Sequence, residues 1–135
     1  MFKQKRWIMV AVVAGLLMVT LACGTGYSTT YKRIGDRGTV VVNIESVDGS
    51  RKNTVQIDEN FVWDTVSLDI TVEVESGNYS AIFTDDEGQT LQLEASPGNP
   101  ASASTQMETD GSGEITLQSQ GEGVEGVKIT IDYSK

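Results

Sequence analysis

The sequence predicts an all-β protein, an antiparallel β-sandwich of about seven to nine short strands preceded by a signal-peptide helix. Three observations predict this fold class. From Thr39 onward, apolar residues alternate with polar ones, which is the period of a strand that buries one face. Clusters of turn-forming residues recur about every ten residues, a spacing typical of a sandwich. No stretch after Asp36 repeats its apolar residues with the 3.6-residue period of a helix.

The first 22 residues have the pattern of an export signal. Three basic residues and no acidic one precede an apolar run of sixteen residues, from Trp7 to Ala22 (WIMVAVVAGLLMVTLA). A membrane-spanning helix needs about twenty apolar residues, so this run is short for a span. A basic start, a short apolar core and a small residue before the cleavage point are typical of a signal peptide. We therefore expect residues 1–22 to be a signal peptide.

The residues around the lone cysteine extend this interpretation. Thr20-Leu21-Ala22-Cys23 resembles the lipobox of bacterial lipoproteins, although the commonest pattern has Leu where this chain has Thr20. The resemblance covers residues 1–24. It implies that Cys23 becomes the first mature residue and carries a diacylglyceryl group and palmitate-type acyl chains. These would anchor the protein outside the cytoplasm, at the bacterial cell membrane or outer membrane. The alternative is an uncleaved anchor helix with a free thiol.

The segment after the cysteine is polar, rich in small residues and without periodicity (GTGYSTTYKRIGD). We therefore expect residues 23–37 to form a lipid-anchored flexible tether and residues 38–135 to form the β-sandwich domain. A flexible coil of this length spans on the order of 20 Å. Tyr27 and Tyr31 are then either membrane-interface anchors or aromatic residues without a role in the tether.

The first half of the domain contains the clearest strand. Between residues 66 and 75, five apolar residues alternate with polar ones, which defines a buried face and a solvent-exposed face. Ser76-Gly77-Asn78 is expected to turn this strand into residues 79–84 as its hairpin partner. Asp48-Gly49-Ser50 is expected to form an earlier turn, because Gly and Asp favour turns. Shorter strands are predicted at residues 40–44, 55–57 and 61–63.

The second half continues as short strands separated by turns and loops. Asp85-Asp86-Glu87-Gly88 and Asp110-Gly111-Ser112-Gly113 have the composition of turns. Both prolines lie in residues 96–104, and residues 120–126 are rich in Gly and Glu, so each segment is predicted to be a loop. Strands are predicted around residues 91–93, 107, 115–118 and 127–133.

Composition excludes much of active-site chemistry. The 135 residues include no histidine and one cysteine. Without histidine there is no Ser-His-Asp or Cys-His machinery and no His-ligated metal, and one cysteine allows no intrachain disulfide. Ten basic and nineteen acidic residues give a net charge of −9. Removal of the first 22 residues takes away three basic residues and leaves −12. This charge argues against nucleic acid as a partner.

Two acidic turns are the candidates for a metal site. Asp85, Asp86 and Glu87 offer carboxylates of the kind that Ca²⁺ binds. The segment from Asp110 starts like an EF-hand calcium loop, but it lacks the Gly at the sixth position and the Glu at the twelfth. The alternative is that both segments are hairpin turns made of turn-forming residues. Apart from Ca²⁺, no cofactor is expected.

Three further carboxylates, Asp69, Glu73 and Glu75, lie on the polar face of the longest predicted strand. A glycoside hydrolase needs two carboxylates on either side of a cleft. Nothing in the sequence predicts a cleft or long shaping loops, so we interpret these residues as a solvated face. We expect no enzymatic activity, and a small carboxylate-dependent hydrolase is the alternative.

Phe61 and Trp63 have odd numbers, whereas the apolar residues of the strand that follows have even numbers. Either a bulge near Asp64-Thr65 turns both rings into the core, or this strand shows its aromatic face to solvent. We expect core packing. An exposed Trp63 would instead be a candidate for stacking against a sugar or for docking a partner.

These observations together predict a non-catalytic, lipid-anchored, extracytoplasmic β-sandwich that acts as a binding, accessory or envelope-structural module. The alternative is a calcium- or carbohydrate-binding module on the cell surface. The expected partners are the membrane, through a lipid on Cys23, and an unknown envelope protein or glycan.

Overall fold

The computed structural model describes residues 26–135, and this part of the chain is all-β, as the sequence predicts. The expected signal-peptide helix and Cys23 lie outside the described residues. Within residues 26–135, no helix is long and apolar enough to cross a membrane. The seven strands pair antiparallel. They are Tyr27–Ile34 (β1), Arg37–Gln56 (β2), Thr65–Glu73 (β3), Tyr79–Thr84 (β4), Thr90–Ala95 (β5), Ala101–Glu108 (β6) and Glu114–Ser134 (β7).

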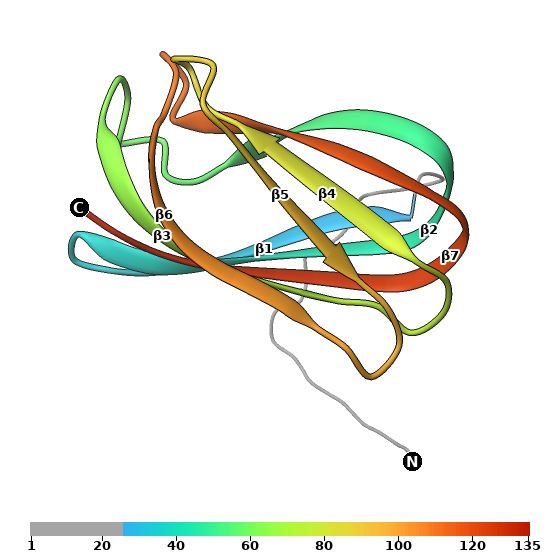
Figure 1. The fold of residues 1–135 in the computed structure, drawn as a ribbon. Coiled ribbons are helices and arrows are strands. Elements are labelled where there is room, and N and C mark those ends of the chain that lie inside the picture. Colours follow the sequence, from blue (N-terminus) through green and yellow to red (C-terminus); the bar gives the residue numbers. More distant parts are fainter. Residues whose placement is uncertain (1–25) are drawn as a thin grey trace.

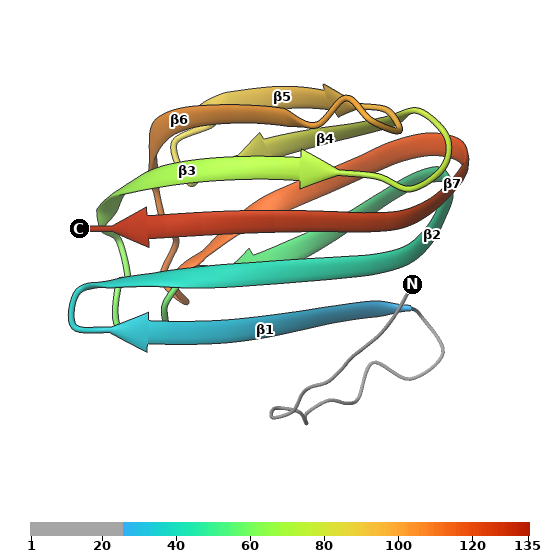
Figure 2. The ribbon, with the colours of Figure 1, turned by 90° about the horizontal axis from the view of Figure 1, so that it is seen from below.

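The strands form two layers, and β2 and β7 run through both of them (Figure 1 and Figure 2). Residues 37–47 of β2 and 124–134 of β7 lie in the first layer, whose strand order is β1-β2-β7-β3-β6. Residues 49–56 of β2 and 114–121 of β7 lie in the second layer, where β7 pairs with β4 and β4 with β5. The fold is therefore a sandwich whose layers share two continuous strands.

Both long strands bend where they pass from one layer to the other. Their register shifts between Val47 and Gly49, which is a β-bulge. On the opposite strand, Gly123 and Gly126 have positive φ angles of 62° and 69°. Glycine lets a strand turn a corner with little steric penalty. The turn predicted after Val47 and the loop predicted at residues 120–126 are therefore wrong, because the glycines bend strands that stay paired.

The first strand corrects the predicted tether. All eight residues of β1 pair with β2, starting with Tyr27 opposite Ile44. The prediction of a flexible tether for residues 23–37 is thus wrong for residues 27–34, and the folded domain begins earlier than residue 38. The sequence hides this strand because β1 lies at the edge of the first layer, where only one side is paired and polar residues are tolerated.

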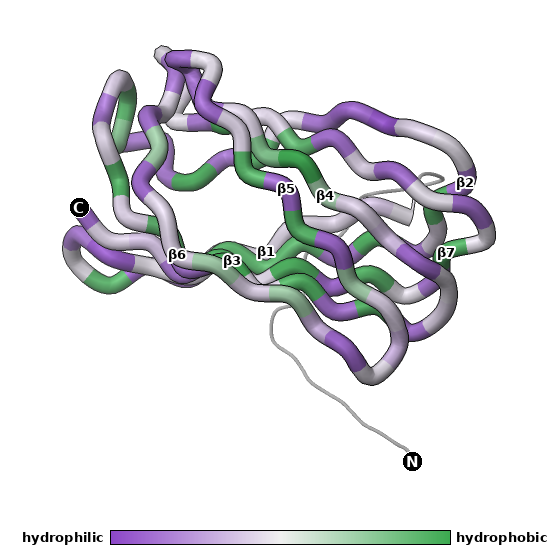
Figure 3. Tube along the Cα trace, in the orientation of Figure 1, coloured by the Kyte–Doolittle hydropathy of each residue, from purple (hydrophilic) through white to green (hydrophobic). Residues whose placement is uncertain are grey.

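The core lies between the layers, and the alternation in the sequence identifies much of it (Figure 3). The four even-numbered apolar residues of β3 are at most 1% exposed, which confirms the predicted buried face. Burial of a side chain of this size stabilises the fold by about 1.5–3 kcal/mol. The largest fully buried side chains include Tyr79, Phe83, Ile44, Ile57, Leu68, Ile70 and Met107.

The connection from β3 to β4 is not a hairpin. β3 pairs with β6 and β7, whereas β4 pairs with β5 and β7. Residues 76–78 therefore carry the chain from one layer to the other, and Gly77 passes so close to the bend of β7 that a Cβ there would lie 3.0 Å from Val124 Cα. The loop predicted for residues 96–104 is also too long, because β6 begins at Ala101 and its small residues pair with β3.

Candidate functional site

Three large hydrophobic side chains are exposed at one end of the sandwich. This open end lies opposite the bend of β2 and β7 and holds the β1–β2 turn, the β2–β3 loop (residues 57–64) and the C-terminus (Figure 2). Ile34 is 68% exposed, Val62 is 40% exposed and Trp63 is 62% exposed. We call these three residues the open-end surface. Val62 and Trp63 are neighbours on the β2–β3 loop, whereas Ile34 lies on the outer face of the first layer, near Lys32 and Arg37. Adjacent exposed apolar side chains such as Val62 and Trp63 mark sites of interaction more often than single ones do.

The β2–β3 loop is fixed to the rest of the open end by polar contacts. The backbone N–H of Lys135 donates to the carbonyl of Asp36 at 3.1 Å, and Lys135 Nζ lies 3.0 Å from a carboxylate oxygen of Asp64. The hydroxyl of fully buried Thr109 accepts the N–H of Asp64 at 3.1 Å and donates to the carbonyl of Phe61. The loop is therefore a defined support for the side chains it carries.

Trp63 has a strained backbone and an exposed ring. Its φ of 53° lies in the left-handed region, which costs a residue with a Cβ about 1–2 kcal/mol. Its N–H donates to the carbonyl of Asp110 at 3.1 Å, and a Cβ on Gly111 would lie 2.8 Å from Trp63 Cζ2. The ring thus rests against the backbone of the β6–β7 turn. Core packing was the wrong expectation for Trp63 and the right one for Phe61, because the left-handed residue breaks the alternation.

Asp58 is a buried carboxylate that joins the loop to the first and last strands. Its side chain accepts the hydroxyl of Tyr133 at 2.7 Å, the N–H of Asn60 at 2.9 Å and Arg33 Nε at 2.8 Å. The ring of Phe61 packs edge-on against Tyr133 with centroids 5.8 Å apart, and the guanidinium of Arg33 lies 5.9 Å from the Phe61 centroid. Arg33, which the sequence places in the tether, is therefore part of the packed domain.

These contacts shift the pKa values of Asp58 and Tyr133. Burial by itself raises the pKa of Asp58, but hydrogen bonds from Asn60 and Tyr133 and the charge of Arg33 outweigh it and hold the pKa below 3.8. Burial, together with the bond to Asp58, raises the pKa of Tyr133 to about 12. At neutral pH Asp58 is therefore a carboxylate and Tyr133 a neutral phenol, and neither is poised for proton transfer near pH 7.

A groove of about 280 Å³ opens beside this network, between β1 and the start of the β2–β3 loop. We call it the side groove. Tyr31 is 53% exposed in it, whereas Ile57 is 1% exposed. The side groove thus combines an accessible aromatic ring, a buried apolar base and several polar side chains. Its lining residues are Tyr31, Arg33, Gln56, Ile57, Asp58, Glu59, Asn60 and Tyr133.

The calcium candidates Asp85, Asp86 and Glu87 lie in the β4–β5 turn, where Asp85 has a structural role. One carboxylate oxygen of Asp85 accepts the N–H groups of Glu87 at 3.0 Å and Gln89 at 2.8 Å, and the other accepts the N–H of Glu108 at 3.0 Å. Asp85 therefore closes the turn and fastens it to β6. Asp86 and Glu87 are exposed, and a hydrogen bond with Glu87 raises the pKa of Glu108.

The second acidic turn repeats this arrangement. One carboxylate oxygen of Asp110 accepts the N–H groups of Ser112 at 2.8 Å and Glu114 at 3.0 Å. Gly88 and Gly113 occupy the same place in the two turns, with φ angles of 87° and 76°. Both segments are turns, and the interpretation as a hairpin turn is confirmed for residues 85–88, which join the paired strands β4 and β5. It is wrong for residues 110–113, because β6 pairs with β3 and not with β7, so this turn carries the chain from one layer to the other. Within residues 26–135, no three His, Cys, Asp or Glu side chains are grouped so that they could hold a metal ion.

The three carboxylates expected on the polar face of β3 do not come together. Asp69 lies directly opposite Asp132 of β7, Glu73 lies opposite Lys128, and Glu75 lies beyond the strand. Asp69 and Asp132 line a groove of about 440 Å³ on the outer face of the first layer. The sequence does not reveal the Asp69–Asp132 pair, because the partner of a strand is not written in the strand itself.

The side groove also escapes sequence reasoning. Tyr31 and Arg33 lie in the segment predicted as a tether, while Asp58 and Asn60 lie in a short connection between predicted strands. The one available signal is the alternation of Tyr27, Tyr31 and Arg33 on odd positions, which places them on one face of a strand.

Comparison with known proteins identifies no family. No family model matches the chain, and no curated protein matches it. Among solved structures, a chain of the cryo-EM structure of the giant freshwater prawn Macrobrachium rosenbergii extra small virus VLP matches with 17% identity and a TM-score of 0.35. That match covers 93% of this chain and 88% of the viral chain. With so low a TM-score, it supports no conclusion about the fold or the function of this chain.

Proposed function

We propose that this chain is a non-catalytic, lipid-anchored, extracytoplasmic module of the bacterial envelope that binds its partner through the open end. The lipobox-like sequence at Cys23 supports the anchor. The observation that carries the binding role is the open-end surface, where Val62 and Trp63 are exposed on a loop fixed by several hydrogen bonds and Ile34 is exposed at the same end of the sandwich. A rigid support lowers the entropy lost on binding, so such a surface suits recognition.

The place where the chain enters the fold favours this orientation. β1 begins at Tyr27, which pairs with Ile44 near the bend of β2 and β7. Four residue steps separate Cys23 from Tyr27, and a fully extended chain covers about 14 Å over that distance. A lipid on Cys23 would therefore hold the bend close to the bilayer. The open end would then face away from the membrane, toward other envelope components.

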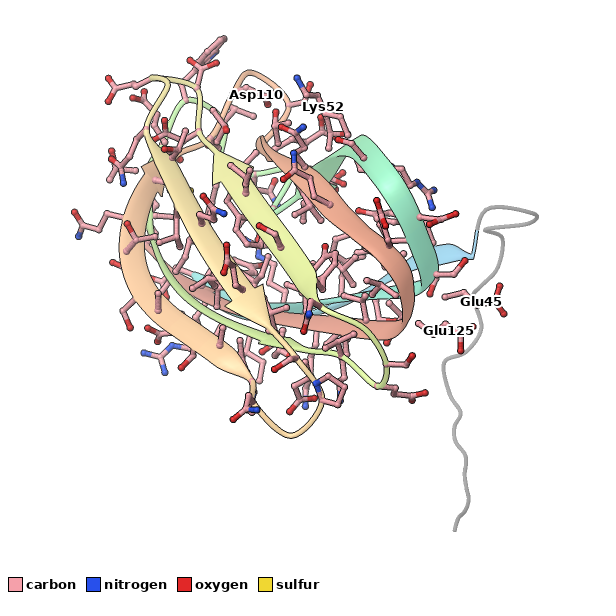
Figure 4. All side chains as sticks on the ribbon, turned by 45° about the vertical axis from the view of Figure 1, so that its right-hand side comes forward. Glu45, Lys52, Asp110 and Glu125 are labelled. Carbon is pink, nitrogen blue, oxygen red and sulfur yellow. The ribbon has the colours of Figure 1, made fainter. Side chains whose placement is uncertain are left out.

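The charge near the bend supports a domain that stands off the lipid surface. Glu45 and Glu125 lie on the side where β1 begins (Figure 4). Anionic headgroups repel such carboxylates within a Debye length of about 8 Å at physiological salt. The exposed acidic residues of this region are Glu45, Asp48, Glu75, Glu122 and Glu125.

The arrangement of the carboxylates supports a non-catalytic role. In the described part of the chain, Asp58, Asp85 and Asp110 use their oxygens to hold turns together. A general acid or base needs a pKa near the working pH and access to substrate. A saturable hydrolytic activity of the purified protein that disappears with a single carboxylate substitution would contradict this part of the proposal.

The binding role can be tested with a photo-crosslinking amino acid in cells. At position 62 it replaces the half-exposed Val62 beside Trp63, and at position 102 it replaces the exposed Ser102 on the outer face of β6. We expect a discrete crosslinked product from position 62 and none from position 102. Products from position 102 alone, or equal products from both, would place the partner elsewhere.

Trp63 favours carbohydrate binding as a second candidate function. Aromatic rings with one open face stack against the C–H face of sugars, and Trp63 is the one tryptophan outside the first 22 residues. A glycan array, followed by fluorescence titration of Trp63, tests this candidate. Gly111→Ala tests the role of Trp63 without removing it. The added Cβ would displace the indole ring, so we expect a weaker fluorescence response to the sugar while the domain stays folded. A silent array would contradict the carbohydrate candidate.

Calcium binding stays a prediction for Asp86 and Glu87, which are exposed beside the structural carboxylate of Asp85. An ion that binds only the folded state stabilises it by an amount that grows with the logarithm of the ion concentration relative to Kd. The melting temperature in millimolar Ca²⁺ and in chelator decides the matter. An unchanged melting temperature would contradict calcium binding, and a rise that Asp86→Asn abolishes would support it.

A further inference from the structure

We propose that the side groove binds one neutral sugar residue, either a free saccharide or the end of a glycan. The side groove shares no residue with the open-end surface, so this inference goes beyond the proposed function and does not depend on it. It combines three features: a cavity sized for one ring, an accessible aromatic face, and polar side chains that match hydroxyl groups.

The size of the side groove limits its occupant. Its volume of about 280 Å³ lies just below the usual range of about 300–1,000 Å³ for small-molecule pockets. A volume of this size suits a single ring. Tyr31 supplies the stacking surface, because its side chain is 53% exposed while its backbone is held by pairing with Val40 of β2. Aromatic rings bind the apolar face of a sugar in this way.

The polar residues of the side groove match the hydroxyl groups of a sugar. A hydroxyl both donates and accepts, so a sugar needs both kinds of partner. Gln56 Nε2 donates to the carbonyl of Ser112 at 3.2 Å, so Gln56 offers a ligand chiefly its amide oxygen as an acceptor. Asn60 carries an amide as well, while Glu59 accepts and Arg33 donates. The guanidinium of Arg33 is fixed by Asp58 through Nε at 2.8 Å, yet the side chain keeps 46% exposure. Donors on its terminal nitrogens are therefore positioned in advance and accessible.

The charge of the side groove selects a neutral ligand. Arg33 is balanced by Asp58, and Glu59 leaves one negative charge in excess. The domain as a whole is strongly acidic as well. Both charges repel an acidic sugar that carries a carboxylate or phosphate. A purely apolar ligand would take the exposed polar side chains of the side groove, Arg33 and Glu59 among them, out of water without offering them a hydrogen bond, which is unfavourable.

Saturation-transfer NMR of the ligand tests the proposal on the full mature chain, in a detergent without a sugar headgroup. The probes are methyl glucoside, methyl galactoside, N-acetylglucosamine and glucuronate, and then a neutral disaccharide. We expect transfer to at least one neutral sugar and none to glucuronate. Transfer to only one end of the disaccharide indicates a glycan terminus, and equal binding of the monosaccharide indicates the free sugar. Transfer to none of the neutral sugars, or to glucuronate alone, would overturn the proposal.

Variants then place the sugar in the side groove. Tyr31→Ala should lower the affinity at least tenfold, and Glu59→Ala, on the exposed rim, should lower it several-fold. Lys32→Ala is the matched control, because Lys32 neighbours Tyr31 on β1 but lies on the other face of the sheet. Trp63→Ala should leave the affinity unchanged. Binding that survives both groove variants, or that is lost with Trp63→Ala, would overturn the assignment of the sugar to this groove.

Discussion

The buried carboxylate of Asp58 leads to a stability prediction that the structure makes quantitative. Asp58→Ala removes the acceptor for Tyr133 at 2.7 Å, Arg33 at 2.8 Å and Asn60 at 2.9 Å. Removal of one partner from a buried ion pair costs about 3–5 kcal/mol. Water can solvate the side chain of Arg33, which is 46% exposed, so we expect about 3 kcal/mol, the low end of that range. For a domain of this size, the melting temperature should fall by roughly 12 °C.

The pH dependence of the unfolding free energy distinguishes the contribution of the Asp58 charge from that of its hydrogen bonds. Its folded pKa lies below 3.8, so its contribution to stability is full above about pH 4 and is lost as the pH falls through the folded pKa. Asp58→Asn keeps one acceptor oxygen, which can serve the N–H of Asn60, but it puts an NH₂ group in place of the oxygen that accepts from Tyr133 and it loses the charge that pairs with Arg33. It should destabilise by about 1.5 kcal/mol at pH 7, and its difference from the parent should shrink in acid.

Urea unfolding, followed by Trp63 fluorescence at pH 7, 5 and 3, measures both effects. Glu59→Ala is the control. Glu59 is the neighbour of Asp58 in the sequence but is exposed, so its loss should change the unfolding free energy by less than about 0.5 kcal/mol. A loss below about 1 kcal/mol for Asp58→Ala at pH 7 would refute the reasoning about the buried pair. A difference for Asp58→Asn that stays constant in acid would refute the assigned pKa direction.

Two further predictions concern the turns and the buried phenols. Gly113→Ala should destabilise the domain by about 3 kcal/mol or more in urea unfolding, because its Cβ would lie 2.1 Å from the carbonyl oxygen of Asp58. Gly88→Ala has open space around it and should cost only about 1 kcal/mol. Equal losses for the two variants would contradict this reasoning. Burial raises the pKa of Tyr79 and of Tyr133 from 10.0 to about 12, so their contribution is full below pH 10 and is lost between pH 10 and 12. The double Phe variant should lose less stability over that range, and an identical fall in both proteins would contradict the assignment.

The parts of the fold that sequence reasoning predicted correctly depend on local patterns. The buried face of β3 follows from strict alternation, and the turns at Asp85 and Asp110 follow from Asp and Gly at a fixed spacing. Each pattern lies within a few residues, so one chain contains all the information needed.

The parts that it missed depend on distant residues. Gly49 and Gly126 are typical turn residues, yet they bend strands that stay paired, and only the pairing of β2 with β7 shows this. The edge strand β1 is polar because one side is unpaired, and so it was taken for a tether. The contact between Arg33 and Asp58 joins residues 25 positions apart and has no local signal.

The lipid anchor is the most directly testable part of the account, because the orientation of the domain follows from it. Intact-mass spectrometry of the protein extracted from its native membrane measures both the first residue and the modification. We expect a chain of residues 23–135 that carries a diacylglyceryl group and an acylated amine on Cys23. A full-length chain with an unmodified Cys23 would contradict the anchor and, with it, the proposed orientation of the open end away from the membrane.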